Sequence, residues 1–120
     1  ETSYVIAEPY SSADFLHGPI AVIDEGFPVV AIAPSGKVLA DMTSLIDVLD
    51  ERRAELIVIS DRQELLDRAR AALPLPTGVP EWLSPVTAAI PGQLWALALA
   101  LTRGLDPDRP RGLAKVTETL

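Results

Sequence analysis

Two short apolar runs separated by a helical pattern constrain the fold of this chain more than any other feature. Residues 28–34 and 56–60 contain no charged side chain, which is typical of strands buried on both faces of a sheet. Between them, apolar residues recur at helical spacing over 38–49, opposite a face that carries acidic side chains. A strand, a helix and a strand in this order imply parallel strands and a right-handed crossover. We therefore predict an α/β fold, a three-layer sandwich in which helices flank a mostly parallel, Rossmann-like sheet.

The residues after the second strand predict a further helix and an edge strand. Asp61 stands three residues before Glu64, which is the spacing of a capping box at a helix start. The sequence Leu-Pro-Leu-Pro at 73–76 has too much proline for a central strand, so we expect it at an edge or in a crossover. Ligands of parallel sheets bind beyond the carboxyl ends of the strands. In this chain those ends fall near 33–36 and 60–62.

A long helix is predicted from Trp82 to Gly104. Ser84 suits its N-cap, with Pro85 at the first helical position. Its conspicuous apolar run, residues 94–101, is far shorter than the roughly 20 residues that a membrane span needs. We therefore expect a buried helix and no membrane contact.

Composition narrows the classes of function. The 120 residues are enough for one domain, and 17 acidic against 10 basic side chains give a net charge of −7, which disfavours nucleic acid as a partner. Cysteine is absent and there is a single histidine, so we expect no metal site, no cofactor and a cytoplasmic location. The chain begins with Glu1 and shows no signal-peptide pattern, which suggests a piece of a longer protein.

Three polar residues are candidates for chemistry. Proline and glycine exclude helix from Gly104 to Lys115, and an anchored segment of this kind can present the Lys115 amine to a carbonyl. A solvated terminus is the alternative. His17 follows a short helical turn that Gly-Pro ends, and an exposed imidazole there suits proton transfer near neutral pH, although it could also be an ordinary surface residue. Glu1 is a carboxylate that, taken alone, indicates nothing.

Several short sequence motifs, taken together and in order, resemble those of a known family. They are Glu-Thr-Ser-Tyr at 1–4, Ala7-Glu8, the His-Gly-Pro word at 11–19, Gly-Phe-Pro-Val at 26–29, Pro-Gly-Gln-Leu at 91–94, residues 104–110 and Leu-Ala-Lys at 113–115. The chain resembles the second, C-terminal sugar-isomerase (SIS) domain of glucosamine-6-phosphate synthase and of its deaminase-type relatives that lack a glutaminase domain. The likeness runs over nearly the whole chain.

The resemblance implies a role for each candidate. Glu1 falls where the family places the base that moves a proton between sugar carbons 1 and 2, and Lys115 matches the lysine at the open-chain carbonyl. His17 matches the histidine that assists ring opening from the partner subunit, and the backbone of Ala114 would touch the sugar. The resemblance also implies a homodimer and an N-terminal SIS domain in the same chain, whose loops hold the substrate phosphate.

The expected function is therefore aldose–ketose isomerisation of an amino-sugar phosphate, with release or transfer of ammonia. The ending Val-Thr-Glu-Thr-Leu at 116–120 and the Glu1-Thr2 pair are more similar to the deaminase-type relatives. Nothing in this chain could hydrolyse glutamine by an N-terminal cysteine. The alternative is a non-catalytic SIS domain that senses sugar phosphates in a regulator, which would need contacts to the sugar but no base.

Overall fold

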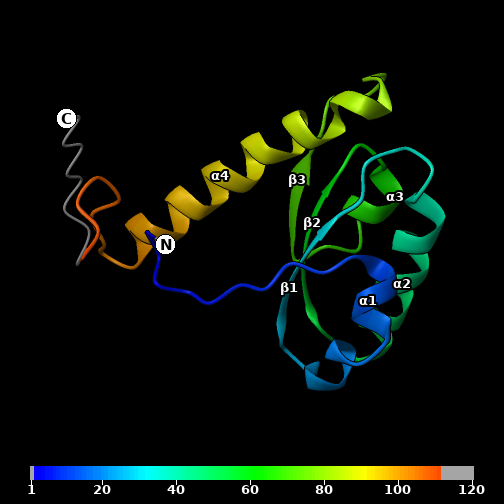
Figure 1. Cartoon of the computed structure of the whole chain (residues 1–120), viewed down its shortest axis with the longest axis horizontal. Coiled ribbons are helices and arrows are strands. Elements are labelled where there is room, and N and C mark those ends of the chain that lie inside the picture. Colours follow the sequence, from blue (N-terminus) through cyan, green and yellow to red (C-terminus); the bar gives the residue numbers. More distant parts are fainter. Residues whose placement is uncertain (1, 112–120) are drawn as a thin grey trace, which may run out of the picture. The chain divides into compact units, whose positions relative to one another are not determined.

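The computed structural model describes residues 2–111, and the chain separates into two compact units. Residues 8–92 form the larger one, which we call the sheet unit (Figure 1). Among the described residues, 2–7 together with 93–111 form the other, which we call the terminal unit. The terminal unit therefore joins segments from opposite ends of the sequence.

The sheet unit is built on three parallel strands. They are β1 (Pro28–Ile32), β2 (Glu55–Ser60) and β3 (Ala71–Pro74), in the order β1-β2-β3. Val30 pairs with Ile57 across the first ladder. Parallel strands in sequence order need crossovers over the sheet faces, so the predicted parallel α/β arrangement is confirmed.

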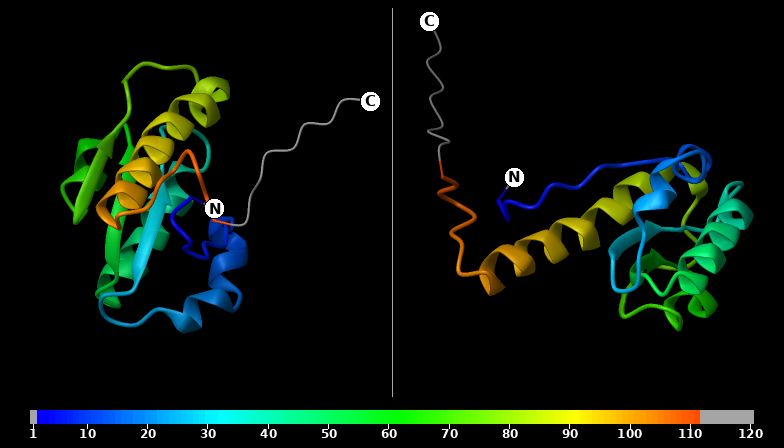
Figure 2. Two further views of the ribbon diagram at one scale, coloured as in Figure 1. Left: turned by 90° about the vertical axis from the view of Figure 1, so that its left-hand side faces the viewer. Right: turned by 90° about the horizontal axis from the view of Figure 1, so that it is seen from below.

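Helices precede, connect and follow these strands. In chain order they are α1 (Ser12–Leu16), the 3-10 helix η1 (Pro19–Val22), α2 (Leu39–Glu51), α3 (Gln63–Leu66), the 3-10 helix η2 (Glu81–Leu83) and α4 (Ser84–Thr102). Within the sheet unit, α2 and α3 provide the crossovers that link the strands (Figures 1 and 2).

One face of the sheet packs against α2 and α3. Ile46 and Leu49 of α2 are fully buried, as is Val58 of β2. These side chains belong to one cluster, whose other buried members are Ile23, Ala31, Ala33, Leu45, Leu56, Leu65 and Leu66. The cluster explains why the helical spacing over 38–49 and the strand at 56–60 could be recognised, since both put their apolar side chains into the same core.

The start of α4 covers part of the opposite face of the sheet, but Val30 and Ile32 of β1 are 42% and 49% exposed, so the expected burial of this strand on both faces is wrong. Ile59 of β2 points away from the first cluster because side chains alternate along a strand. It packs with Leu75 and with Ala88 of α4, and all three are buried. Helices therefore lie on both faces of the sheet unit, which confirms the predicted three-layer sandwich.

Two local predictions need adjustment. Asp61 does not cap α3, because the N-cap is Arg62, whose side chain makes no capping hydrogen bond. The Asp61 carboxylate instead accepts a hydrogen bond from the backbone N–H of Ser35, 2.7 Å away. Asp61 therefore binds the loop after β1 and not the start of α3. The edge strand exists as expected at one end of the three-strand order, but β3 begins at Ala71, before the proline-rich word.

Helix α4 begins at Ser84 as predicted and continues through Pro91. The prediction that its run 94–101 is buried is wrong for this chain by itself. The side chains of Leu94 and Leu101 are 61% and 57% exposed, although Ala100 between them is fully buried. Residues 81–102 are also apolar and long enough to cross a membrane, which the length of the run alone had excluded. One such helix is weak evidence, since core helices of soluble proteins have the same composition.

Candidate functional site

The carboxyl ends of β1 and β2 are tied together by a buried serine. Ser60 ends β2 and is fully buried. Its hydroxyl donates to the carbonyl oxygen of Ala33 at 2.6 Å and accepts the backbone N–H of Arg62 at 3.0 Å. The hydroxyl thus satisfies two main-chain groups that would otherwise lack partners where the strands end.

Asp61 fixes the loop that follows β1. Burial by itself would raise the pKa of the Asp61 carboxyl, but hydrogen bonds from Ser35 and from its own backbone, with the nearby Arg62 charge, outweigh burial and lower that pKa. The carboxylate is therefore ionised near neutral pH. A charged acceptor strengthens the bond from the Ser35 N–H.

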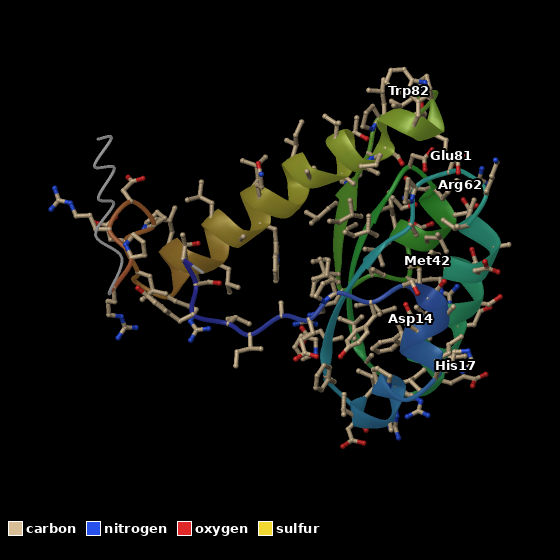
Figure 3. The ribbon with its side chains drawn as sticks, viewed as in Figure 1. Asp14, His17, Met42, Arg62, Glu81 and Trp82 are labelled. Atoms are coloured by element: carbon tan, nitrogen blue, oxygen red, sulfur yellow. The ribbon has the colours of Figure 1, made fainter. Side chains whose placement is uncertain are left out.

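Glu81 closes the same loop from η2. Its Oε1 accepts the backbone N–H of Lys37 at 2.8 Å. A Cβ on Gly36 would lie only 2.5 Å from that oxygen, so the close approach of the carboxylate depends on glycine at this position. Figure 3 shows Glu81 and Arg62 at one end of the sheet unit, with Asp14 and His17 placed away from that end.

These contacts decide what the strand ends can bind. Two backbone N–H groups of the loop, at Ser35 and Lys37, could serve an anionic ligand. Each already donates to a carboxylate, on Asp61 and Glu81 respectively. Two negative charges at this place would repel a phosphate. The expected ligand position near 33–36 and 60–62 is therefore filled by the protein's own side chains.

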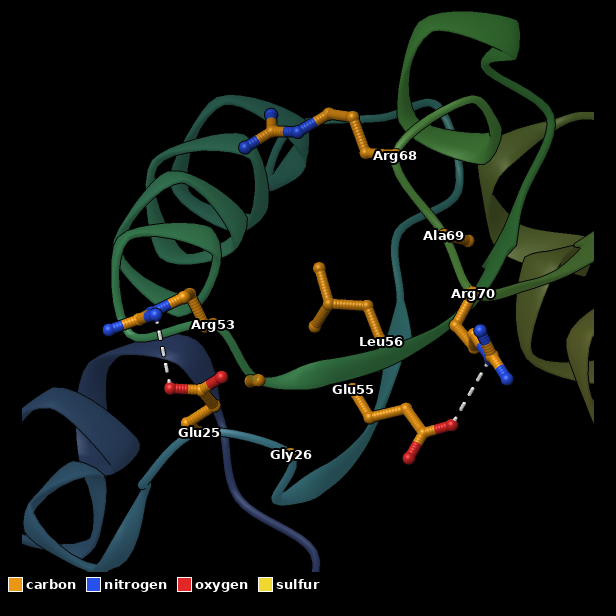
Figure 4. Close-up of a pocket in the computed structure, with 9 residues that line it drawn as sticks. Glu25, Gly26, Arg53, Glu55, Leu56, Arg68, Ala69 and Arg70 are labelled. Atoms are coloured by element: carbon orange, nitrogen blue, oxygen red, sulfur yellow. Dashed lines mark ion pairs between the residues drawn. The ribbon is translucent and has the colours of Figure 1, made fainter.

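An open hollow of about 560 Å³ lies at the other end of the strands (Figure 4). Three arginines line it, and each is paired with carboxylates. Arg53 lies 3.1 Å from Glu25, Arg70 lies 3.4 Å from Glu55, and Arg68 binds both Asp47 and Asp50. The hollow is thus lined by ion pairs. It lies at the amino ends of the strands, opposite the end where ligands of parallel sheets bind.

His17 ends the first helix of the sheet unit. It is the C-cap of α1, and its backbone N–H donates to the carbonyl oxygen of Asp14 at 3.2 Å. Ser11 caps the other end through the N–H of Asp14. The residue is exposed, so the short turn and the accessibility predicted for His17 are confirmed, whereas its chemical role is a separate question.

The terminal unit contains the second feature of interest, a contact between Tyr4 and Arg111. The backbone N–H of Arg111 donates to the Tyr4 hydroxyl, and the Arg111 guanidinium lies 4.4 Å from the centre of the Tyr4 ring. Tyr4 has a φ of 51°, in the left-handed region that bulky residues rarely adopt. The contact joins residues that are 107 positions apart.

This contact bears on the other predicted site residues. Glu1, Ala114 and Lys115 lie outside the described residues. Tyr4 follows Glu1 by three residues, and Arg111 precedes Lys115 by four. The structure therefore brings together the segments that lead to the two predicted catalytic residues at the ends of the chain. His17 belongs to the other unit.

Sequence reasoning missed Tyr4, Arg111 and Glu81. Tyr4 lies in the opening Glu-Thr-Ser-Tyr word, and Arg111 stands directly before Gly-Leu-Ala-Lys. Tyr4 thus belongs to a recognised motif, whereas Arg111 lies between the motifs at 104–110 and 113–115, and Glu81 lies in none. The pairing of Tyr4 with Arg111 was not visible, because a single sequence does not show which aromatic ring contacts which arginine.

The parallel three-layer sandwich with filled strand ends defines an α/β domain, and comparison with known proteins specifies which one. The model of the SIS domain family matches residues 1–103. This chain belongs to the SIS domain family. The match contains the whole of α4, so the apolar helix is part of the SIS domain.

The chain is also similar to curated aminotransferases. It is 47% identical over 115 residues to the glutamine–fructose-6-phosphate aminotransferase (isomerizing) of Thermococcus kodakarensis, and 40% identical over 118 residues to that of Zymomonas mobilis. Each comparison covers 96% of this chain and 19% of the relative. The chain thus spans about a fifth of the length of these relatives.

Solved structures agree with this placement. The C-terminal domain of glucosamine-fructose-6-phosphate aminotransferase from Francisella tularensis superposes with a TM-score of 0.79 at 32% identity, over 90% of this chain and 31% of that one. A Salmonella typhimurium structure has a TM-score of 0.74 at 20% identity and shows the fold alone. The chain is homologous to the C-terminal domain of the aminotransferase, as its sequence words predicted.

Proposed function

We propose that this chain is the C-terminal SIS domain of a phosphosugar isomerase that acts on an amino-sugar phosphate, with release or transfer of ammonia. The observation that carries the proposal is the contact between Tyr4 and Arg111, since it joins the segments leading to Glu1 and Lys115. Membership of the SIS family and the isomerizing aminotransferase activity of the relatives support the reaction class.

In this proposal Glu1 is the base. A carboxylate can take a proton from one sugar carbon and return it to the neighbouring carbon, through one enolate-like intermediate. The Lys115 ammonium lies at the open-chain carbonyl, where it forms an imine or stabilises the negative charge that develops on oxygen. The backbone of Ala114 contacts the sugar beside it. Opening of the cyclic sugar is assigned to His17 of a second copy, so the working unit is a homodimer.

The substrate phosphate is assigned to an N-terminal SIS domain of the same polypeptide. Two observations support this division. The relatives are about five times longer than the chain, and the strand ends of the sheet unit are filled by the carboxylates of Asp61 and Glu81. A site with these two charges has no free main-chain donors at Ser35 and Lys37 for a phosphate. We therefore expect the 120 residues alone to show no measurable isomerase activity, and the full-length natural polypeptide to show it.

The decisive experiment follows exchange of the hydrogen on carbon 2 of a sugar phosphate with solvent deuterium. The full-length polypeptide should catalyse exchange, and Glu1→Gln should abolish it while sugar-phosphate binding persists. Lys115→Ala should slow open-chain chemistry, and His17→Ala should slow cyclic substrates more than open-chain ones. Wild-type rates in all three variants would contradict the proposal.

A mixing experiment tests the shared site. Dimers formed from His17→Ala and Lys115→Ala protomers contain one site with both residues intact if His17 acts across the subunit boundary. They should recover part of the activity that each variant lacks. No recovery at any mixing ratio would contradict the assignment of His17 to the partner.

The same assays distinguish the alternatives. Ammonia release from glucosamine 6-phosphate without glutamine favours a deaminase, which the ending of the chain resembles, whereas glutamine-dependent synthesis favours the aminotransferase. Binding without exchange at carbon 2 favours a sensor of sugar phosphates.

A further inference from the structure

We infer that Arg52 is a positioning residue for His17, because it fixes the 3-10 helix η1 that begins two residues after the histidine. The inference rests on the proposed function, in which His17 opens the cyclic sugar. Arg52 is the C-cap of α2 and acts through the main chain rather than on the sugar. Arg52, His17 and η1 all belong to the sheet unit.

The Arg52 guanidinium binds two main-chain carbonyl groups at the end of η1. Its Nη1 donates to the carbonyl oxygen of Ile20 at 3.0 Å and, over a longer 3.4 Å, to that of Ile23. A charged donor makes such hydrogen bonds stronger than those between neutral groups, and the carbonyl end of a helical turn attracts a cation. The two bonds span 32 and 29 positions of the sequence, so they tie η1 to the end of α2.

The backbone links η1 closely to His17. Gly18 is the N-cap of η1 and Pro19 is its first residue, so His17 directly precedes the capped turn. The Gly18 carbonyl accepts the N–H of Ala21 at 2.9 Å, and the proline ring fixes one backbone dihedral of the short link. Movement of η1 would therefore move the backbone of His17.

The other side of His17 is held without Arg52. Phe15 of α1 packs against the buried cluster of the sheet unit, as does Ile20 of η1, and Ser11 caps the start of α1. His17 is exposed between these two anchored segments, on the surface of the sheet unit (Figure 3). Its imidazole is therefore accessible to a second copy while its backbone stays in place, as a site shared between protomers requires. Loss of the Arg52 contact should loosen one side of this arrangement and leave α1 folded.

The test uses the full-length polypeptide and follows incorporation of solvent deuterium into fructose 6-phosphate and into its 5-deoxy analogue, which lacks the ring-closing hydroxyl. Misplacement of a reacting group by about 1 Å can reduce a rate by about 100-fold. Because Ile20 still packs against the cluster, Arg52→Ala should slow exchange into fructose 6-phosphate by about tenfold and into the open-chain analogue by less than about twofold. Equal losses with both substrates would show a merely structural role and overturn the inference.

A double-mutant cycle tests whether Arg52 acts through His17. In a His17→Ala background, Arg52→Ala should cause no further loss with fructose 6-phosphate, since no imidazole is left to position. An equal loss in the wild-type and His17→Ala backgrounds would overturn the inference, because Arg52 would then act independently of the histidine.

Two further variants keep the test valid if Arg52→Ala folds poorly. Arg52→Met keeps an apolar stem but has no donor, and it should show the same selective loss. Arg52→Lys keeps a charged donor and should recover part of the rate with fructose 6-phosphate. Arg53→Ala is the matched control, because this neighbouring arginine pairs with the exposed Glu25, and it should retain wild-type rates with both substrates. A loss in Arg53→Ala equal to that in Arg52→Met, or no loss in a folded Arg52→Met protein, would overturn the inference.

Amide hydrogen exchange gives a readout that does not depend on activity. In the full-length polypeptide, the peptide that contains residues 17–24 should exchange at least about tenfold faster in Arg52→Met than in wild type, because the N–H groups of Ala21 and Ile23 bond within the turn that Arg52 holds. Exchange at residues 40–48 of α2 should be unchanged. Unaltered exchange at 17–24 would overturn the inference. Faster exchange there, together with wild-type rates of His17→Ala on both substrates, would overturn the role of His17 in the proposed function and with it the positioning role of Arg52, but not the contact.

Discussion

The backbone of Gly36 passes so close to the Glu81 side chain that a Cβ at position 36 would lie 2.5 Å from Glu81 Oε1. The same oxygen accepts the N–H of Lys37. A loop after β1 and the segment before α4 are thus held together by one carboxylate that fits only over a residue without a side chain.

Gly36→Ala should lower the free energy of unfolding by about 1 kcal/mol, because the new methyl group displaces the carboxylate and its hydrogen bond is lost. The cost is limited because Glu81 is exposed at its end and can move. In a Glu81→Ala background the same substitution should cost less. Urea unfolding of the four chains measures this coupling, and equal costs in both backgrounds would contradict the contact.

Ser60→Ala should destabilise the chain by about 2 kcal/mol, because it leaves the carbonyl of Ala33 and the N–H of Arg62 without their buried partner. Ser44→Ala is the matched control, since that hydroxyl is exposed on α2 and bonds only a helix carbonyl. Thermal and urea unfolding should separate the two variants clearly. A Ser60→Ala chain as stable as the Ser44→Ala chain would contradict the two hydrogen bonds that we assign to the Ser60 hydroxyl.

Asp61→Asn should show a stability loss that depends on pH. The carboxyl has a pKa below its ordinary value of about 3.9 when folded, so its extra stabilisation is present above about pH 5 and is lost as pH falls through the folded pKa. The variant lacks this contribution at every pH. The difference between the two chains should be about 1 kcal/mol at pH 7 and should approach zero in acid. A difference that widens on acidification would contradict the sign of the shift.

Arg68→Ala should cost about 1 kcal/mol at low salt, because its guanidinium binds Asp50 at 2.6 Å and Asp47 at 2.8 Å while its side chain is only 27% exposed. In 1 M salt the cost should fall, since screening acts over about 3 Å. Arg53→Ala is the control. Its pair with Glu25 joins side chains that are 74% and 68% exposed, and its removal should change the unfolding free energy by less than about 0.5 kcal/mol.

Much of the fold was predictable because the local pattern of apolar residues agrees with the positions that these residues take in the core. The apolar runs at 28–34 and 56–60 became neighbouring parallel strands, and Ser84 became the start of α4. The Asp61 prediction was wrong because capping is a local rule, whereas the competing donor, Ser35, comes from another strand end. The predicted burial of 94–101 was wrong for Leu94, Leu97 and Leu101, because the hydrophobicity of a helix does not show what packs against it.

The candidate site was predictable only through short sequence motifs. His17 could be placed at the end of a short exposed helix from Gly-Pro alone. The roles of Glu1, Ala114 and Lys115 came from the family resemblance and stay predictions, since these residues lie outside the described part of the chain. The contact between Tyr4 and Arg111 joins segments that are distant in the sequence, which no periodicity encodes.

The exposed apolar side chains of helix α4 affect how molecules of this protein interact in solution. Leu94, Leu97 and Leu101 recur at intervals of three and four residues and are all more than 40% exposed. Burying such area is favourable by about 25 cal/mol per Å², while the net charge of −7 keeps molecules apart at low ionic strength. In the isolated chain, charge repulsion between molecules therefore opposes the attraction between their exposed apolar side chains. Salt screens the repulsion, so the second virial coefficient should turn from positive to negative as salt is added.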